Sequence, residues 1–198
     1  VFRESRKKPQ ARAGANRLML GEGVGGGPSA RARSGRSNAQ IATAAQRRRA
    51  DAVAARKRAV AAAARRNALS NTLTAKAEGF LDNNQTDLAI ANFRDAFVKN
   101  PKNTRASDGL SNALTAKGIE VAGDTNNETS LTFFNEAVKF DNQNDVAYAK
   151  IGAIHDAKGQ KDQARANYEK AVAINPAFST LYPPLGLLYI DAGEIAKA

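Results

Sequence analysis

The fold class is indicated most directly by residues 148–176, which read YAKIGAIHDAKGQKDQARANYEKAVAINP. Small, aromatic and small side chains follow one another at Ala164, Tyr168 and Ala171. Spacings of four and three residues place these side chains on one face of a helix. Pro176 comes next and ends that helix, because proline has no backbone N–H to continue it. The stretch therefore predicts a helix with a packed face and a defined end.

A second helix precedes the first, because Tyr148, Ile151 and Gly152 lie at helical spacing ahead of Gly159. Glycine suits the left-handed turn between two paired helices. The small–aromatic–small order also occurs upstream, as Ala89-x3-Phe93-x2-Ala96-x4-Pro101 and Ser130-x3-Phe134-x2-Ala137-x4-Asn142. Downstream, the opening pattern returns as Tyr182-x2-Leu185-Gly186-x2-Tyr189. The sequence therefore predicts a repeated helical hairpin.

This pattern resembles the signature of the tetratricopeptide repeat (TPR): an aromatic residue, Leu-Gly and Tyr on one helix, then Ala, an aromatic residue and Pro on the next. The resemblance implies an all-α solenoid of helical hairpins, in which small residues let helices approach closely. Four units are expected, at residues 70–103, 104–144, 145–178 and 179–198. The second has seven extra residues, which we expect around Ile119–Thr125 in a lengthened first helix that ends at Gly123. The fourth is incomplete, so we expect the natural chain to continue beyond Ala198.

Charge divides the chain at about Leu69. Residues 1–69 hold 17 Lys/Arg and three acids, whereas residues 70–198 hold 13 Lys/Arg and 16 acids. Residues 1–38 are rich in Gly, Ser and Arg, and they are expected to be disordered because they have little apolar surface to bury. Residues 39–69 are rich in Ala and Arg and are expected to form a helix or linker. The TPR solenoid is thus predicted to follow a disordered or helical basic arm.

The arm has three basic clusters: Arg47-Arg48-Arg49, Arg56-Lys57-Arg58 and Arg65-Arg66. They recur every nine residues, which spreads their charge around a helix and leaves no apolar stripe. The arm is interpreted either as a solvated spacer or as a segment that docks on an acidic protein, a nucleic acid or an anionic lipid. Because aromatic residues are lacking, contacts with nucleic acid would be made to phosphates and would depend on salt.

The resemblance also implies a concave surface, lined by the first helix of each hairpin, that binds an extended peptide or a partner helix. The expected groove positions are Asn71, Thr74, Glu78, Arg105, Asp108, Asn112, Thr115, Val146, Ala149, Ala153, Asp156, Pro183, Leu187 and Ile190. Some members of the family bind chaperone tails with a Lys/Asn/Arg clamp. Of the corresponding positions here, only Lys150 carries a suitable side chain, so a chaperone-tail receptor is not expected.

Residues for catalysis are scarce. There is no cysteine, and the single histidine, His155, replaces a tyrosine of the repeat pattern and is interpreted as a packing residue. One histidine without cysteine makes a metal site improbable. Glu78 and Asp82 could share a helix face, but such pairs are usually surface charges. No catalytic residue, cofactor or metal ion is predicted, and no apolar run is long enough to span a membrane.

The sequence therefore predicts a non-catalytic scaffold within a larger multiprotein machine. Its Asn/Gln-rich, Cys-free repeats resemble the TPR modules of bacterial envelope assemblies, such as secretion channels and pili, in which a TPR region can precede a secretin-type channel. We accordingly expect a location in the bacterial cell envelope or periplasm. One alternative is a nucleoprotein or organellar accessory subunit that binds RNA or DNA through the arm. Another is an enzyme whose catalytic domain lies beyond Ala198.

Overall fold

The computed structural model describes residues 38–122 and 127–197 of the chain. Within these ranges the regular elements are all helices, which confirms the predicted all-α class. The α-helices are α1 (Asn38–Asp82), α2 (Thr86–Lys99), α3 (Thr104–Glu120), α4 (Asn127–Phe140), α5 (Asp145–Ala157), α6 (Lys161–Ile174) and α7 (Tyr182–Asp191). Two short 3-10 helices, Ser179–Leu181 and Ile195–Lys197, flank α7.

The chain divides into two units, Val1–Asp51 and Ala52–Ala198. Of the first unit, the structure describes only the beginning of α1, where side chains from Ala39 onward are exposed apart from the half-buried Ala44. The predicted disordered segment, residues 1–38, lies outside the described residues except for Asn38, the first residue of α1.

Within the second unit, α1 passes without interruption through the boundary that we expected at Ser70. From Ala52 to Leu69 its residues are exposed, except for the half-buried Ala63. Burial begins at Ser70 and continues at Thr74 and Ala77. Spacings of four and three residues make one buried stripe, the pattern of a helix that packs on one side only. Helix α1 is therefore continuous at Ser70, and the first hairpin begins where side chains of α1 become buried.

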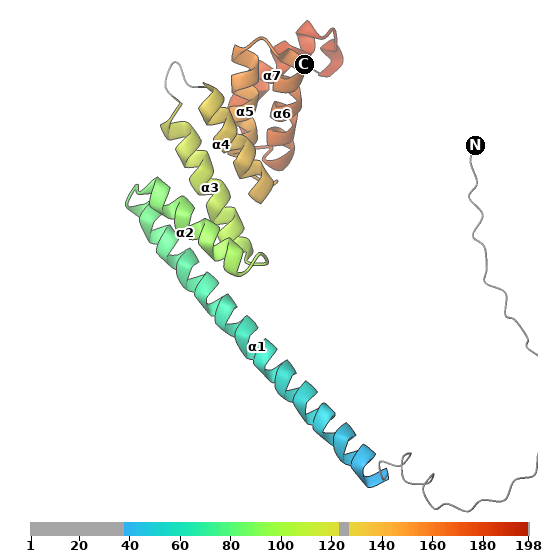
Figure 1. Ribbon diagram of the computed structural model, residues 1–198. Helices are drawn as coiled ribbons and strands as arrows, with labels where there is room; N and C mark the ends of the chain where they lie inside the picture. Colours follow the sequence, from blue (N-terminus) through green and yellow to red (C-terminus); the bar gives the residue numbers. More distant parts are fainter. Residues whose placement is uncertain (1–37, 123–126, 198) are drawn as a thin grey trace, which may run out of the picture. The chain divides into compact units, whose positions relative to one another are not determined.

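The hairpins follow one another in chain order, each helix contacting the next from α2 to α7 (Figure 1). Left-handed residues form the tight turns: Asn84 (φ 56°) between α1 and α2, and Gly159 (φ 70°) between α5 and α6. In the second turn, the backbone N–H of Gln160 donates to the carbonyl of His155 at 2.9 Å. This bond closes the end of the helix as a left-handed C-terminal residue requires. The predicted role of Gly159 is thus confirmed.

The second helices of the three hairpins, α2, α4 and α6, each contain 14 residues. Each has one buried aromatic residue at its middle: Phe93, Phe134 and Tyr168. These rings lie against glycines of the neighbouring first helices. A Cβ added at Gly152 would stand 2.6 Å from Tyr168 Cδ1, and one at Gly118 would stand 2.5 Å from Phe134 Cε1. The expectation that small residues permit close helix contact therefore agrees with the packing.

A half-buried asparagine, Asn103, joins the two ends of the first hairpin. Nδ2 of Asn103 donates to Ser70 Oγ at 2.8 Å and to Thr74 Oγ1 at 3.2 Å. Oδ1 of Asn103 accepts the backbone N–H of Ala106 at 3.3 Å and so caps the N-terminus of α3. Ser70 Oγ in turn donates to the carbonyl of Ala96 at 2.8 Å, near the end of α2. We call this set of bonds the Ser/Thr/Asn clamp.

The same clamp recurs in the next hairpin. Nδ2 of Asn144 donates to Ser111 Oγ at 2.8 Å and to Thr115 Oγ1 at 3.0 Å, while its Oδ1 caps α5 through the N–H of Ala147. Ser111 Oγ donates to the carbonyl of Ala137 at 2.9 Å. Among the described residues, no buried side-chain nitrogen or oxygen lacks a hydrogen-bond partner. Buried polar groups of this kind are tolerated only when they are satisfied in this way.

The two clamps fix the register of the repeats. The serine and asparagine are 33 positions apart in both, so Ser70–Asn103 and Ser111–Asn144 are equivalent units. The seven extra residues are therefore Thr104–Leu110, the first two turns of α3. This register corrects the expected location at Ile119–Thr125. Helix α3 ends at Glu120, and the expected end at Gly123 lies outside the described residues.

Candidate functional site

The expected groove residues lie on α1, α3, α5 and α7, the first helices of the hairpins, but they differ in burial. Nine are exposed: Asn71, Arg105, Asp108, Asn112, Val146, Ala153, Pro183, Leu187 and Ile190. Glu78 and Asp156 are half-buried. Thr74 and Thr115 are buried in the clamps, and Ala149 is buried against α6. These last three side chains are therefore unavailable to a partner in this structure.

Four of the expected residues surround one hollow of about 360 Å³, which we call the α1–α3 hollow. They are Glu78 on α1 and Arg105, Asp108 and Asn112 on α3. Its other lining residues are Leu81, Phe93, Thr104 and Gly109. Thus the structure gathers part of the expected groove around a single concave site.

Beneath the α1–α3 hollow, α3 is packed closely on α2 at Gly109. A Cβ at this position would collide with the ring of Phe93, so glycine permits α3 to lie directly on that ring, which is fully buried. The half-buried side chain of Leu81 supplies the apolar surface that the hollow presents. The sequence did not indicate Leu81, Phe93, Thr104 or Gly109 as groove residues. One sequence signal could have indicated this contact. Gly109 lies in a predicted first helix, next to the repeat whose central aromatic residue is Phe93.

The rim of the hollow carries an ion pair. Arg105 binds Glu78 through two bonds, from Nε to Oε1 at 2.6 Å and from Nη2 to Oε2 at 2.5 Å. The Arg105 side chain is 68% exposed, so the pair contributes at most about 1 kcal/mol to folding. The pair matters for ligand binding. Among the residues that line the hollow, Arg105 carries the guanidinium, and this group already has a carboxylate partner in Glu78.

Asp108 and Asn112 have no such partners. Asp108 is exposed, and its carboxylate accepts only a long bond of 3.4 Å from the hydroxyl of Ser107. Within residues 38–122 and 127–197, Asp108 makes no ion pair and the side chain of Asn112 makes no hydrogen bond. Their oxygens are therefore open to a ligand at the α1–α3 hollow.

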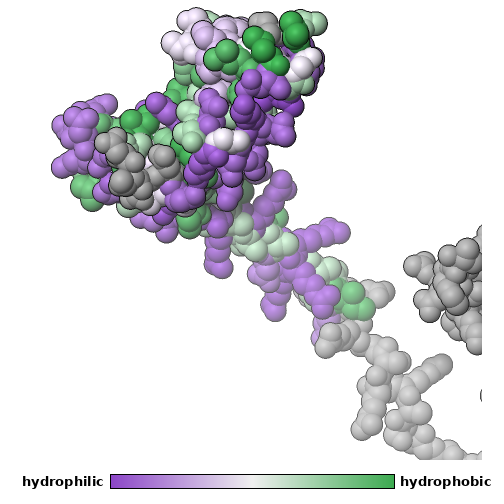
Figure 2. All heavy atoms as spheres, turned by 90° about the horizontal axis from the view of Figure 1, so that it is seen from above, coloured by the Kyte–Doolittle hydropathy of each residue, from purple (hydrophilic) through white to green (hydrophobic). Residues whose placement is uncertain are grey.

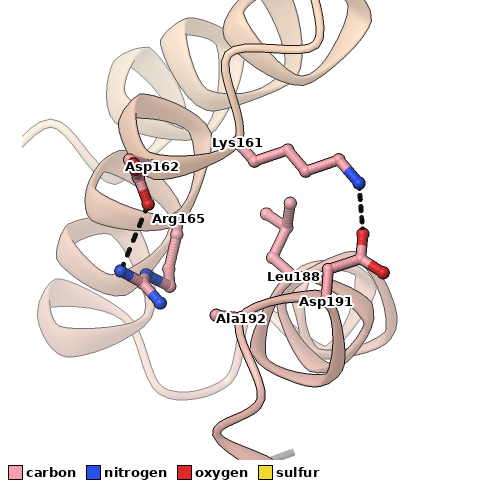
Figure 3. A pocket seen from close by; sticks show the side chains of 6 residues that line it. All are labelled: Lys161, Asp162, Arg165, Leu188, Asp191 and Ala192. Carbon is pink, nitrogen blue, oxygen red and sulfur yellow. Dashed lines mark hydrogen bonds and ion pairs between the residues drawn. The ribbon is translucent and has the colours of Figure 1, made fainter.

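A smaller hollow of about 180 Å³ lies between α6 and α7, and its charges are compensated internally (Figure 3). Lys161 Nζ donates to Asp191 at 2.6 Å, and Arg165 donates to Glu194 at 2.9 Å and to Asp162 at 3.4 Å. The hydrogen bond to Asp191 raises the pKa of Lys161 above its usual value. This hollow is consequently bridged by the protein's own side chains.

The basic arm is fully accessible where the structure describes it. All eight of its basic residues, Arg47, Arg48, Arg49, Arg56, Lys57, Arg58, Arg65 and Arg66, are exposed. In the described part of the chain, none of them makes an ion pair. Figure 2 shows hydrophilic side chains projecting on either side of this exposed helix. Their charges are therefore available for an electrostatic partner.

In the described ranges, no group of three or more His, Cys, Asp or Glu residues could hold a metal ion. The half-buried His155 pairs through Nδ1 with Gln160 Oε1 at 2.6 Å, across the α5–α6 turn. No described helix is both long enough and apolar enough to cross a membrane.

Comparison with known proteins adds a family match for one repeat. Residues 146–178 match the family model described as tetratricopeptide repeat. This range coincides with the third hairpin, α5 and α6, for which the sequence pattern was strongest.

Two curated relatives share part of the chain. Anaphase-promoting complex subunit 3 of Schizosaccharomyces pombe is 29% identical over 86 residues, or 43% of this chain. BBSome complex member BBS4 of Bos taurus is 40% identical over 57 residues, or 29% of this chain. The matches span only 13% and 11% of these two proteins. Among solved structures, the Arabidopsis OM64 TPR domain aligns with a TM-score of 0.44 and 16% identity, covering 64% of this chain and 98% of that one.

Proposed function

We propose that this chain, whose residues 146–178 match the tetratricopeptide repeat model, is a non-catalytic scaffold that binds a peptide or helix of a partner protein on its concave surface. The observation that carries this proposal is the α1–α3 hollow, where four expected groove residues meet beside the half-buried Leu81. A concave, partly apolar site with a few convergent polar groups is the usual form of a binding site.

Two further observations support the proposal. The exposed groove residues continue along α5 and α7, where Leu187 is 65% exposed and Ile190 is 52% exposed. Apolar side chains presented at a surface favour contact with another protein. In addition, both curated relatives are named as members of multiprotein complexes. The more specific placement in a bacterial envelope assembly stays a prediction from the composition of the repeats.

The test is selection of peptides from a displayed library on the full chain, followed by affinity measurement on two variants. One variant, Asn112→Arg with Ala153→Arg, places bulk and charge on the concave surface. The matched control, Ala91→Arg with Ala166→Arg, places the same groups at exposed positions of α2 and α6. We expect the first variant to lose about tenfold or more in affinity and the control to retain binding. Equal losses in both, or a library that gives no binder, would contradict the proposal.

A second candidate function rests on the arm, whose eight exposed basic side chains lack ion pairs in the described residues. Such a segment favours an RNA or DNA partner bound through phosphates. Affinity for duplex would then fall with salt at a log–log slope of roughly −0.9 for each phosphate neutralised. Neutralising Arg47-Arg48-Arg49, Arg56-Lys57-Arg58 or Arg65-Arg66 in separate full-chain variants should lower binding by similar amounts. A dominant loss from one cluster would indicate docking on an acidic protein, and no loss would leave the arm as a spacer.

A further inference from the structure

The α1–α3 hollow is a product of the seven extra residues. Half of its eight lining residues, Thr104, Arg105, Asp108 and Gly109, belong to Thr104–Leu110. Seven residues lengthen a helix by about 10.5 Å and turn it through about 700°, only 20° short of two full turns. The insertion therefore displaces the second hairpin along α3 while keeping almost the same face toward its neighbours. Equivalent bonds in both clamps agree with this displacement.

The charges of the hollow select the kind of side chain that fits. The rim holds two carboxylates, Glu78 and Asp108, and one guanidinium, Arg105. Arg105 is satisfied by Glu78, whereas Asp108 has no cationic partner within the described residues. The remaining carboxylate and the side-chain oxygen of Asn112 both accept hydrogen bonds. The carboxylate of Asp108 would repel an anionic ligand, whereas it could pair with a cationic ligand.

The protein itself shows how a lysine side chain can fill a hollow whose rim carries a carboxylate. In the α6–α7 hollow, Lys161 extends past Leu188 and places its ammonium on Asp191 (Figure 3). Two other junctions place a lysine on a carboxylate of the preceding helix, as Lys117 does with Asp87 and Lys158 with Glu128. Carboxylates at these helix junctions are thus paired with lysine of the same chain, whereas no lysine of the described residues pairs with Asp108.

We propose that the α1–α3 hollow binds a lysine or arginine side chain of the partner segment. The alkyl stem lies on the half-buried Leu81, and the cationic head contacts the carboxylate of Asp108 and the side-chain oxygen of Asn112. Long basic side chains commonly bury their methylenes in this way while their charge stays at the surface. The inference rests on the proposed function, because it names the chemistry of the residue that the concave surface recognises.

The experiment is an NMR titration of the full chain, labelled with ¹⁵N, with N-acetyl-lysine methylamide as the probe. N-acetyl-norleucine methylamide is the control ligand, since it has an apolar chain without the ammonium. We expect saturable shifts of the backbone amides of Asp108, Gly109 and Asn112 with the lysine probe and weaker shifts with norleucine. Shifts of equal size with the two probes, or shifts spread over all acidic residues, would overturn the inference.

Two variants locate the interaction. Asp108→Asn removes the unpaired charge at an exposed position, and we expect it to weaken binding of the lysine probe about fivefold. Asp95→Asn removes an exposed carboxylate of α2 that lies outside the expected groove and does not line the hollow, and it should leave binding unchanged. Equal effects of the two variants would mean general attraction to acidic groups and would contradict a specific pocket.

The peptide selection separates this inference from the proposed function. Groove-dependent peptides without a required basic residue, together with a silent lysine titration, would overturn the inference and leave the scaffold function in place. Specific binding of the lysine probe without any groove-dependent peptide would contradict the scaffold function instead.

Discussion

In the units Ser70–Asn103 and Ser111–Asn144, an asparagine links both ends of the hairpin through serine and threonine hydroxyls. In residues 145–178 the equivalent positions hold Asp145, Ala149 and Phe178. Ala149 is only 5% exposed, Phe178 packs in the same apolar cluster, and Asn175 Nδ2 donates to Asp145 at 2.6 Å.

The comparison shows that one hairpin geometry can be held by two kinds of contact. The apolar version is the one that the family model matches, at residues 146–178. The polar version keeps the same 14-residue second helix and the same glycine–aromatic contact. Helix packing therefore defines the repeat, and the clamp is an alternative way to close it.

The largest expected effect comes from removing a clamp. Asn144→Ala removes the cap of α5 and leaves the hydroxyls of Ser111 and Thr115 without their donor, so we expect a loss of about 2–4 kcal/mol in the free energy of unfolding. Asn175→Ala removes one bond to Asp145 and should cost only about 1 kcal/mol. Urea denaturation of both variants measures the difference. Equal losses would mean that the clamp contributes no more than the simpler contact of the third hairpin.

Close helix contact should be of comparable importance in both kinds of hairpin. Gly118→Ala forces a methyl group against Phe134, and Gly152→Ala forces one against Tyr168, so each should cost about 1–3 kcal/mol. Gly79→Ala is the control, because nothing lies within 4 Å of its added Cβ. That variant should gain about 0.5–1 kcal/mol from helix propensity. Thermal melting that ranks Gly79→Ala with the other two would contradict the packing.

The turns offer a smaller contrast. Gly159 has φ of 70°, so Gly159→Ala should lose about 1 kcal/mol through backbone strain, although space for the methyl group is available. Asn84 adopts a similar conformation with a side chain, and Asn84→Gly should change stability by less than about 1 kcal/mol. Chemical denaturation would reveal the two differences. A neutral Gly159→Ala variant would show that this turn tolerates a side chain as readily as the first.

The smallest expected effect concerns the exposed ion pairs. A double-mutant cycle on Glu78 and Arg105 should give a coupling energy below about 1 kcal/mol, and a cycle on the exposed pair Lys161 and Asp191 should give a weak coupling. Both couplings should decrease in salt, because exposed charges are screened. A large coupling at Glu78 and Arg105 that persists in salt would mean that the rim of the α1–α3 hollow is part of the folded core.

Local chemistry allowed much of the fold to be predicted from the sequence. Gly159, the small residues and the central aromatics each indicate a backbone turn or a helix contact, and their spacing places the second helices. The location of the extra residues could not be predicted in the same way. Spacing between motifs counts seven residues but does not say at which end of the long helix they lie, and the clamp bonds supply that information.

The candidate site was predicted less completely than the fold. Thr74 and Thr115 were expected in the groove because the family resemblance places one face of each first helix there, whereas each is buried in a bond to an asparagine from a distant turn. Phe93 was interpreted as core, and its 0% exposure confirms this. The hollow beside it was missed because the repeat pattern does not show how closely α3 packs on α2 at Gly109. Both errors have one origin, since a repeat pattern assigns faces to helices but does not show how a neighbouring unit covers them.

The central claim, that partners bind on the concave surface, is tested most directly by site-specific photocrosslinking to a library-selected peptide. A photoreactive phenylalanine derivative is placed at Asn112 in one sample of the full chain and at Ala91 in another, both exposed positions. We predict that the peptide crosslinks from position 112 and not from position 91. Crosslinking from position 91 alone, or equally from both positions, would contradict binding on the concave surface.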